Sequence, residues 1–253
     1  MLTVPTLTLR SRKASPGPEA PKPFLSHLDE LRQRFWVVAA AFVVCFIFSY
    51  RFVDPVIAFL ANKTGGFIFT QLTEAFMVRV KIAAILGGFL SIPVFLYEGW
   101  KFIGAGLAPT ERQRIMWALP LSYILFTCGS LIGWNLVLPS ATQFLLGFSS
   151  PNLKGLISLD DYINFAGWMT MAFGLLFQLP LIIFFSVGAG LISLETLAYY
   201  RRHIIVALAI LSAVLTPGPD IFSQLAIFLP SCLLFESSYW IARWVYKDKD
   251  KQI

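Results

Sequence analysis

The sequence predicts an all-α polytopic membrane protein with six transmembrane helices, the last two short, and a cytoplasmic amphipathic N-terminal helix. Three observations carry this prediction. Hydrophobic residues make up 57% of the 253 residues and charged residues only 13%, compared with about 25% charged residues in ordinary soluble domains. Apolar runs of about 20 residues, the length that crosses a bilayer core, recur along the chain. Lysine and arginine gather between alternate runs.

Residues 1–23 are predicted to form a disordered basic cytoplasmic tail. They combine Arg10, Arg12, Lys13 and Lys22 with proline, serine and glycine. They lack the apolar core and the small-residue cleavage site that define a cleavable signal peptide. The membrane domain is therefore expected to begin after this tail, at about residue 24.

Residues 24–35 are predicted to form an amphipathic helix that leads directly into the first apolar run. Ser26 and Asp29 have the spacing of a capping box, so the helix is expected to start near Ser26. The opposite face carries charged residues, as expected of a helix at a membrane surface. The apolar residues recur at steps of four, three and four, which places them on one helical stripe: Phe24, Leu28, Leu31 and Phe35.

Glu30 and Arg34 allow two interpretations. In the first, they form a helix-stabilising pair at positions i and i+4, and the segment is a basic anchor beside a membrane span. In the second, the charged face of the helix recognises a ligand. Physical considerations alone favour the anchor.

The remaining apolar runs are separated by polar connections. Residues 54–73 are too polar to cross a membrane, and short surface helices are expected there. The last apolar run is interrupted at residues 216–220, where Thr-Pro-Gly-Pro-Asp predicts a turn. Each half is about 12 to 15 residues, or about 18 to 22 Å of helix, which is shorter than a bilayer core of about 30 Å. Two short spans across a thinned membrane and a re-entrant hairpin would both fit these lengths. The runs cover residues 35–53, 74–97, 115–138, 162–191 and 204–235.

The distribution of lysine and arginine predicts the orientation. In a six-span arrangement, the segments on the side of the two termini carry fifteen of these residues, and the segments on the other side carry three. Positively charged residues favour the cytoplasmic side of a membrane. Both termini are therefore expected in the cytoplasm. Glu74, Arg79 and Lys81 lie near the outer end of the second run, where we expect the long basic side chains to reach the interface.

Five blocks of sequence resemble the TatC family, the receptor subunit of twin-arginine protein translocation. They occur in the family's order and extend over nearly the whole chain. The resemblance implies a six-helix membrane domain at residues 24–244, followed by a charged cytoplasmic tail at residues 245–253, and it selects two short final spans over the re-entrant hairpin. The blocks are Ser26-His-Leu-Asp-Glu-Leu-Arg-Gln-Arg34, Phe76 with Lys81, Pro93-Val-Phe-Leu-Tyr-Glu-Gly-Trp-Lys-Phe102, residues 107–112 and Leu215-Thr-Pro-Gly-Pro-Asp-Ile-Phe-Ser-Gln224.

The resemblance implies a site for twin-arginine signal peptides on the cytoplasmic side. Carboxylates suit this ligand because they accept parallel hydrogen bonds from the planar guanidinium group of arginine. The alternative is that these charges are solvated loop residues whose pairs contribute only about 0 to 1 kcal/mol. The residues implied for signal-peptide binding are Glu30, Arg32, Phe102, Leu107, Glu111 and Arg112.

A second implied site binds single-span partner helices of the TatA and TatB type, through Gln178, Thr216 and Gln224. Asp220 lies between the latter two and is expected to cap the final helix. The chain departs from the family pattern at several positions. Glu98 and Gln178 stand where the family usually has Gln and Glu, respectively, and further departures are Ala105 for Pro, Gln113 for Arg, and one additional residue in segment 216–220.

Two other function classes fit less well. A secondary transporter would show an internal repeat or convergent charges at mid-membrane, and neither appears in the sequence. An intramembrane enzyme would carry a nucleophile with a base or a metal motif, and the sequence has no His-Glu-x-x-His motif. The resemblance to the TatC family implies a receptor for Sec-independent translocation of folded proteins, and we predict that it is not an enzyme, uses no cofactor or metal and binds no nucleic acid. It is expected to form homo-oligomers. The expected location is a bacterial inner membrane, and a thylakoid membrane is the alternative. Both a bacterial and an organelle-encoded origin fit the sequence.

Overall fold

The computed structural model describes residues 24–64, 67–68, 71, 73–105, 109–150, 158–216 and 220–246, except the side chains of residues 24–28, 63–64, 105 and 109–117. Apart from isolated bridges such as the one between Ile68 and Ser158, the described residues contain no β-structure. In chain order the helical elements are α1 (Phe24–Ser49), η1 (Tyr50–Phe52), α2 (Val53–Thr64), α3 (Glu74–Ala105), α4 (Pro109–Ile132), η2 (Gly133–Val137), α5 (Leu138–Leu146), α6 (Leu159–Leu176), α7 (Leu179–Gly188), α8 (Leu194–Tyr199), α9 (Arg201–Leu215) and α10 (Ile221–Tyr246).

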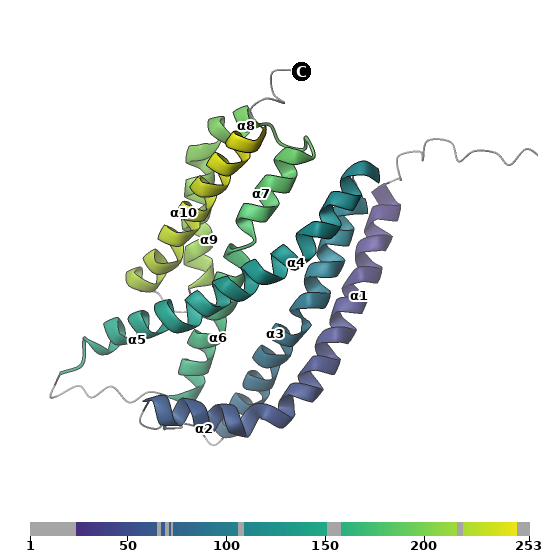
Figure 1. Ribbon diagram of the computed structural model, residues 1–253. Helices are drawn as coiled ribbons and strands as arrows, with labels where there is room; N and C mark the ends of the chain where they lie inside the picture. The colour runs from purple at the N-terminus through teal and green to yellow at the C-terminus, as the bar shows by residue number, and fades with distance from the viewer. Residues whose placement is uncertain are drawn as a thin grey trace, which may run out of the picture.

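The long helices run back and forth between two ends of the molecule (Figure 1). The start of α1, the end of α3, the start of α4 and the end of α10 lie at one end, which we call the terminal end. The start of α6 lies at the other end, which we call the opposite end, and α2 runs across it. Both ends of the described chain therefore lie on the same side of the bundle, and α2 is the surface helix expected in the first linker.

Residues 24–49 form one continuous helix, so the predicted amphipathic segment and the first span are both parts of α1. The helix begins at Phe24, two residues before the predicted start. Leu31 and Phe35 are exposed on the outer surface of the bundle. α1 lies directly against α3, and a Cβ atom at Gly87 would approach the Phe46 Cα to 2.7 Å. A small residue at this contact lets the two backbones approach closely.

Five helical segments among the described residues are long and apolar enough to cross a membrane. The third uses a π-helical turn, η2, to connect α4 with α5, and the fourth breaks between α6 and α7, just before Pro180. The chain is therefore a multi-pass helical membrane protein. The five segments are Asp29–Asn62, Glu74–Gly104, Ala118–Leu146, Leu159–Gly188 and Ile221–Tyr246.

The last two helices differ in length. α9 has 15 residues, or about 22 Å of helix, and is as short as predicted. Because α9 is not among the five segments long and apolar enough to cross a membrane, the count of six spans stays a prediction. α10 has 26 residues, or about 39 Å, and its predicted shortness is wrong. The helix continues beyond Phe235, where Glu236 has a charged partner in Arg201 of α9.

Candidate functional site

Three charged side chains meet at the terminal end, between α1 and α3. Arg34 of α1 donates from one terminal nitrogen to Glu98 Oε2 of α3 at 2.9 Å, and from the other terminal nitrogen to Glu30 Oε1 one turn earlier in α1. We call Glu30, Arg34 and Glu98 the Arg34 cluster. The predicted i,i+4 pair is confirmed, and the structure adds a second carboxylate from a helix 64 residues away in sequence.

The Arg34 cluster is largely shielded from solvent. The side chains of Arg34 and Glu98 are each 12% exposed, and that of Glu30 is 22% exposed. Arg34 Nε is buried and has no hydrogen-bond partner among the described residues. Hydrogen bonds between ions strengthen when water is partly excluded. The cluster is therefore a partly buried place where carboxylates already bind a guanidinium group.

The other predicted signal-peptide residues lie at the same end where the structure describes them. Arg32 is exposed on α1, and Phe102 is half-buried in the last turns of α3. Glu111 and Arg112 lie in the first turn of α4, but their side chains lie outside the description, as does all of Leu107. The fold thus brings three segments with predicted site residues to one end of the bundle (Figure 1).

Gln178, which was predicted to dock a partner helix, is buried inside the chain with 6% exposure. Its Nε2 donates to the Ser122 carbonyl at 2.9 Å, and its Oε1 accepts from the Ser122 hydroxyl. Ser122 in turn accepts from Trp100 Nε1 at 3.0 Å. Both ends of the Gln178 amide therefore bind within the chain, linking the break between α6 and α7 to α4 and α3. Partner docking at Gln178 stays a prediction.

Thr216 and Gln224, the other predicted docking residues, flank the connection between α9 and α10. Thr216 Oγ1 donates to the Ser212 carbonyl at 2.6 Å, and Gln224 is half-buried. Asp220 Oδ1 accepts from the Ser223 backbone N–H at 2.6 Å, which confirms its predicted role as a helix cap. At the start of α10, Phe222 stacks on Phe144 of α5, so the first turn of α10 lies beside α5.

A network of paired charges at the opposite end joins α3 to α6. Lys81 Nζ donates to the two oxygens of Asp160 at 2.6 and 2.8 Å, and Asn164 donates to the same carboxylate at 3.1 Å. Glu74, which is buried, accepts from the Ser158 hydroxyl at 2.6 Å. Lys81 therefore has an anionic partner in α6, and its reach to the membrane interface stays a prediction. The signal for this ion pair in the sequence was Asp160, an acidic residue at the start of the fourth apolar run.

Two further ion pairs join neighbouring elements. Arg79 of α3 contacts Asp54 of α2 at 2.9 Å, and its reach to the membrane interface stays a prediction. Arg201 at the start of α9 pairs through two nitrogens with Glu236 of α10, and its guanidinium lies 5.6 Å from the ring centroid of Tyr239. Glu236 was not among the residues predicted to have a role, although an acidic residue after an apolar run is a signal for such an ion pair.

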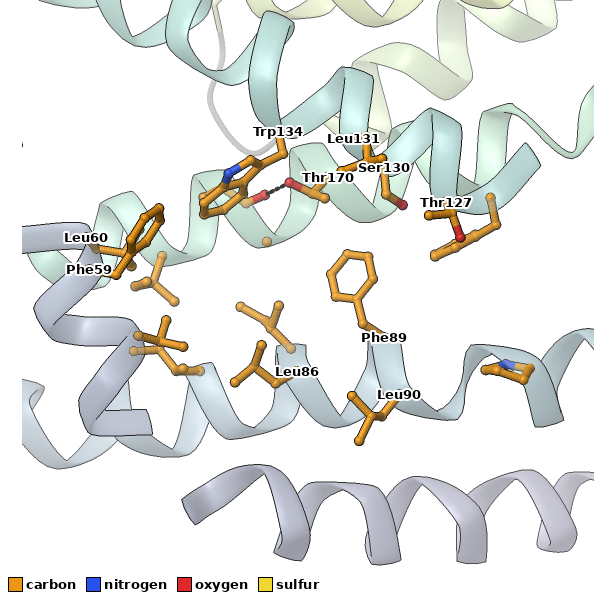
Figure 2. A pocket seen from close by; sticks show the side chains of 18 of the residues that line it. Phe59, Leu60, Leu86, Phe89, Leu90, Thr127, Ser130, Leu131, Trp134 and Thr170 are labelled. Atoms are coloured by element: carbon orange, nitrogen blue, oxygen red, sulfur yellow. Dashed lines mark hydrogen bonds between the residues drawn. The ribbon is translucent and has the colours of Figure 1, made fainter. Parts of the chain in front are cut away.

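A cavity of about 620 Å³ lies between α2, α3, α4 and α6. Figure 2 shows Leu86 and Phe89 of α3 facing Trp134 and Thr170 from the other side. Its lining is mostly apolar; Thr170 donates to the Ala166 carbonyl, so its hydroxyl is already engaged. Among the residues that the structure describes, none of those lining the cavity is a predicted site residue.

Comparisons with known proteins place the chain in a family. The family described as Sec-independent protein translocase protein (TatC) matches residues 26–230. The chain is 35% identical to the TatC protein of Carboxydothermus hydrogenoformans over 231 residues, which cover 90% of this chain and 95% of the relative. It is 37% identical to the TatC protein of Desulforapulum autotrophicum over 239 residues, with coverage of 92% and 88%.

A solved structure agrees with the sequence matches. The crystal structure of a protein described as the twin arginine translocase receptor TatC superposes with a TM-score of 0.76 at 31% identity. The superposition covers 86% of this chain and 98% of the other. Sequence and fold therefore agree over most of the chain, and the protein belongs to the TatC family as a component of the Sec-independent protein translocase.

Proposed function

We propose that this translocase component is the receptor for twin-arginine signal peptides and that it binds them at the terminal end, facing the cytoplasm. The observation that carries the proposal is the Arg34 cluster, in which Glu30 and Glu98 accept hydrogen bonds from one guanidinium group. The same carboxylate chemistry suits the arginine side chains of a signal peptide. The solved relative described as a twin arginine translocase receptor supports this function.

The predicted residues have distinct roles in this proposal. Glu30 and Glu111 bind the two guanidinium groups of the peptide, since they come from the two helices α1 and α4 at the terminal end. The remaining residues shape the surface around these carboxylates: Arg32, Phe102, Leu107 and Arg112. A receptor of this kind binds and releases its ligand without covalent chemistry.

The proposal also includes partners and location. Single-span proteins of the TatA and TatB type dock at the connection between α9 and α10, where Thr216 and Gln224 supply polar groups in an apolar environment. Several copies of the chain assemble in the receptor complex. The membrane is the inner membrane of a bacterium, with the terminal end inside, as the asymmetry of lysine and arginine favours.

The test uses the purified protein in detergent or lipid nanodiscs and two signal peptides that differ only in the paired residues. The Arg-Arg peptide is expected to bind more tightly than the Lys-Lys peptide, because an ammonium group lacks the planar fork that matches a carboxylate. Affinity for the Arg-Arg peptide is also expected to fall as salt is added, since partly exposed charges are screened. Equal affinity for the two peptides would contradict the proposal.

A further inference from the structure

The Arg34 cluster contains a conflict with the proposed function, because the carboxylate assigned to the peptide already has an occupant. Arg34 donates to Glu30 from the next turn of the same helix. The chemical group that Arg34 presents is the group that the peptide would present. A peptide arginine reaching Glu30 must therefore compete with Arg34 for the same acceptor.

The geometry allows Arg34 to leave Glu30 without leaving the cluster. It binds Glu30 and Glu98 through different terminal nitrogens, so either hydrogen bond can open while the other persists. Glu98 is as shielded as Arg34, each being 12% exposed. A guanidinium released from Glu30 thus keeps a charged partner, and its buried Nε, which has no partner among the described residues, is a further donor.

The charges favour such an exchange. Glu30 and Glu98 share one guanidinium group, since both accept hydrogen bonds from Arg34. When a peptide arginine binds Glu30 and Arg34 stays with Glu98, each carboxylate has its own guanidinium partner. Partly buried ions are more stable when each is paired and hydrogen-bonded.

We propose that Arg34 is a built-in competitor of the peptide arginine at Glu30, and that Glu98 is the positioning residue that holds Arg34 when the peptide displaces it. This inference rests on the proposed function. It assigns to Arg34 the control of affinity: the internal pair weakens binding, so a bound signal peptide can be released once it has been recognised.

The experiment measures the affinity for the Arg-Arg peptide in Arg34→Gln, Glu98→Gln and the double variant. Arg34→Gln removes the competitor and is expected to bind the peptide about three- to tenfold more tightly, the equivalent of one hydrogen bond. Glu98→Gln leaves Arg34 with Glu30 alone and is expected to weaken binding. Because Glu98 acts through Arg34, Glu98→Gln should have a smaller effect when Arg34 is already replaced. The loss of affinity from Arg34→Gln to the double variant is therefore expected to be smaller than the loss from the unmutated protein to Glu98→Gln.

Matched variants separate competition from other effects. Arg51→Gln removes the same charge from an exposed position at the opposite end and is expected to leave affinity unchanged. Arg34→Lys keeps the positive charge but loses the planar guanidinium group, so it is expected to tighten peptide binding less than Arg34→Gln does. If Arg34→Gln does not fold, Arg34→Lys takes its place in the experiment. A purely structural role for Arg34 predicts weaker binding in both variants, since loss of packing does not improve a site.

The outcomes distinguish this inference from the proposed function. If the unmutated protein binds Arg-Arg and Lys-Lys peptides equally, both fail. If it prefers the Arg-Arg peptide and the Arg34 variant does not bind it more tightly, only the competitor role is overturned. If Glu98→Gln weakens binding as much without Arg34 as with it, Glu98 contacts the peptide itself, and its holding role is overturned.

Discussion

At the opposite end of the bundle, Lys81 donates to both oxygens of Asp160. At the terminal end, Arg34 is divided between two carboxylates, Glu30 and Glu98. Both arrangements join α3 to another helix, but the first pairs one cation with one anion, whereas in the second two carboxylates share one guanidinium group. The first therefore suits an anchor between helices, and the second suits a site that accepts another cation.

The largest expected effect concerns which of the two ends faces the cytoplasm. In a variant without the three native cysteines, single cysteines at Ser15 and Lys249 are expected to react only with a reagent supplied from the cytoplasmic side. A cysteine at Lys154 is expected to react only from outside, because fifteen lysine and arginine residues favour the terminal side against three on the other. Labelling of Ser15 or Lys249 from outside would contradict the six-span orientation.

The second prediction is that the terminal end determines binding. Glu30→Gln and Glu111→Gln keep the side-chain size and remove the charge, so each is expected to weaken Arg-Arg peptide binding about ten- to a hundredfold. Binding of a Lys-Lys peptide should fall less, because it is already weak. Asp29→Asn, beside Glu30 but exposed, is the control and should retain affinity. Unchanged affinity in both glutamine variants would reduce these carboxylates to surface charges.

The third prediction is that the opposite end determines stability. Asp160→Asn removes the anion that binds Lys81; since these side chains are 26% and 37% exposed, we expect a loss of about 1 to 2 kcal/mol. Thermal unfolding in detergent should show a lower midpoint, while peptide affinity stays the same. Asp161→Asn, in the same first helical turn but exposed, is the matched control. Equal midpoints in the two variants would remove the anchoring role of Asp160.

The smallest expected effect lies at the connection between α9 and α10, which belongs to neither charged cluster. Gln224→Leu is expected to weaken cross-linking to a single-span partner about three- to thirtyfold, because one hydrogen bond between helices in lipid contributes about 0.6 to 2 kcal/mol. Peptide binding should remain intact. Gln33→Leu repeats the chemical change on α1 and should retain partner cross-linking. Unchanged cross-linking in Gln224→Leu would place partner docking elsewhere.

Several features of the fold and site could be predicted because they depend on residues close in sequence. Apolar runs of sufficient length predicted the membrane helices, and the Pro-Gly-Pro segment before Asp220 predicted the interruption between α9 and α10. The spacing of four residues predicted the pair between Glu30 and Arg34, which helical geometry brings together. The length of α10 was missed, because its extension beyond Phe235 includes a Glu236 whose partner lies in α9.

The sequence alone therefore determined the class of the protein, the approximate positions of its helices and the local contacts along each helix. Only the tertiary structure decided that Glu98 joins Arg34, that Asp160 binds Lys81 and that Ser122 engages Gln178. Helical periodicity specifies which residues share a face, but it does not specify how far a neighbouring helix is rotated or shifted along its axis. Packing of whole helices sets that rotation and depth, and these contacts follow from it.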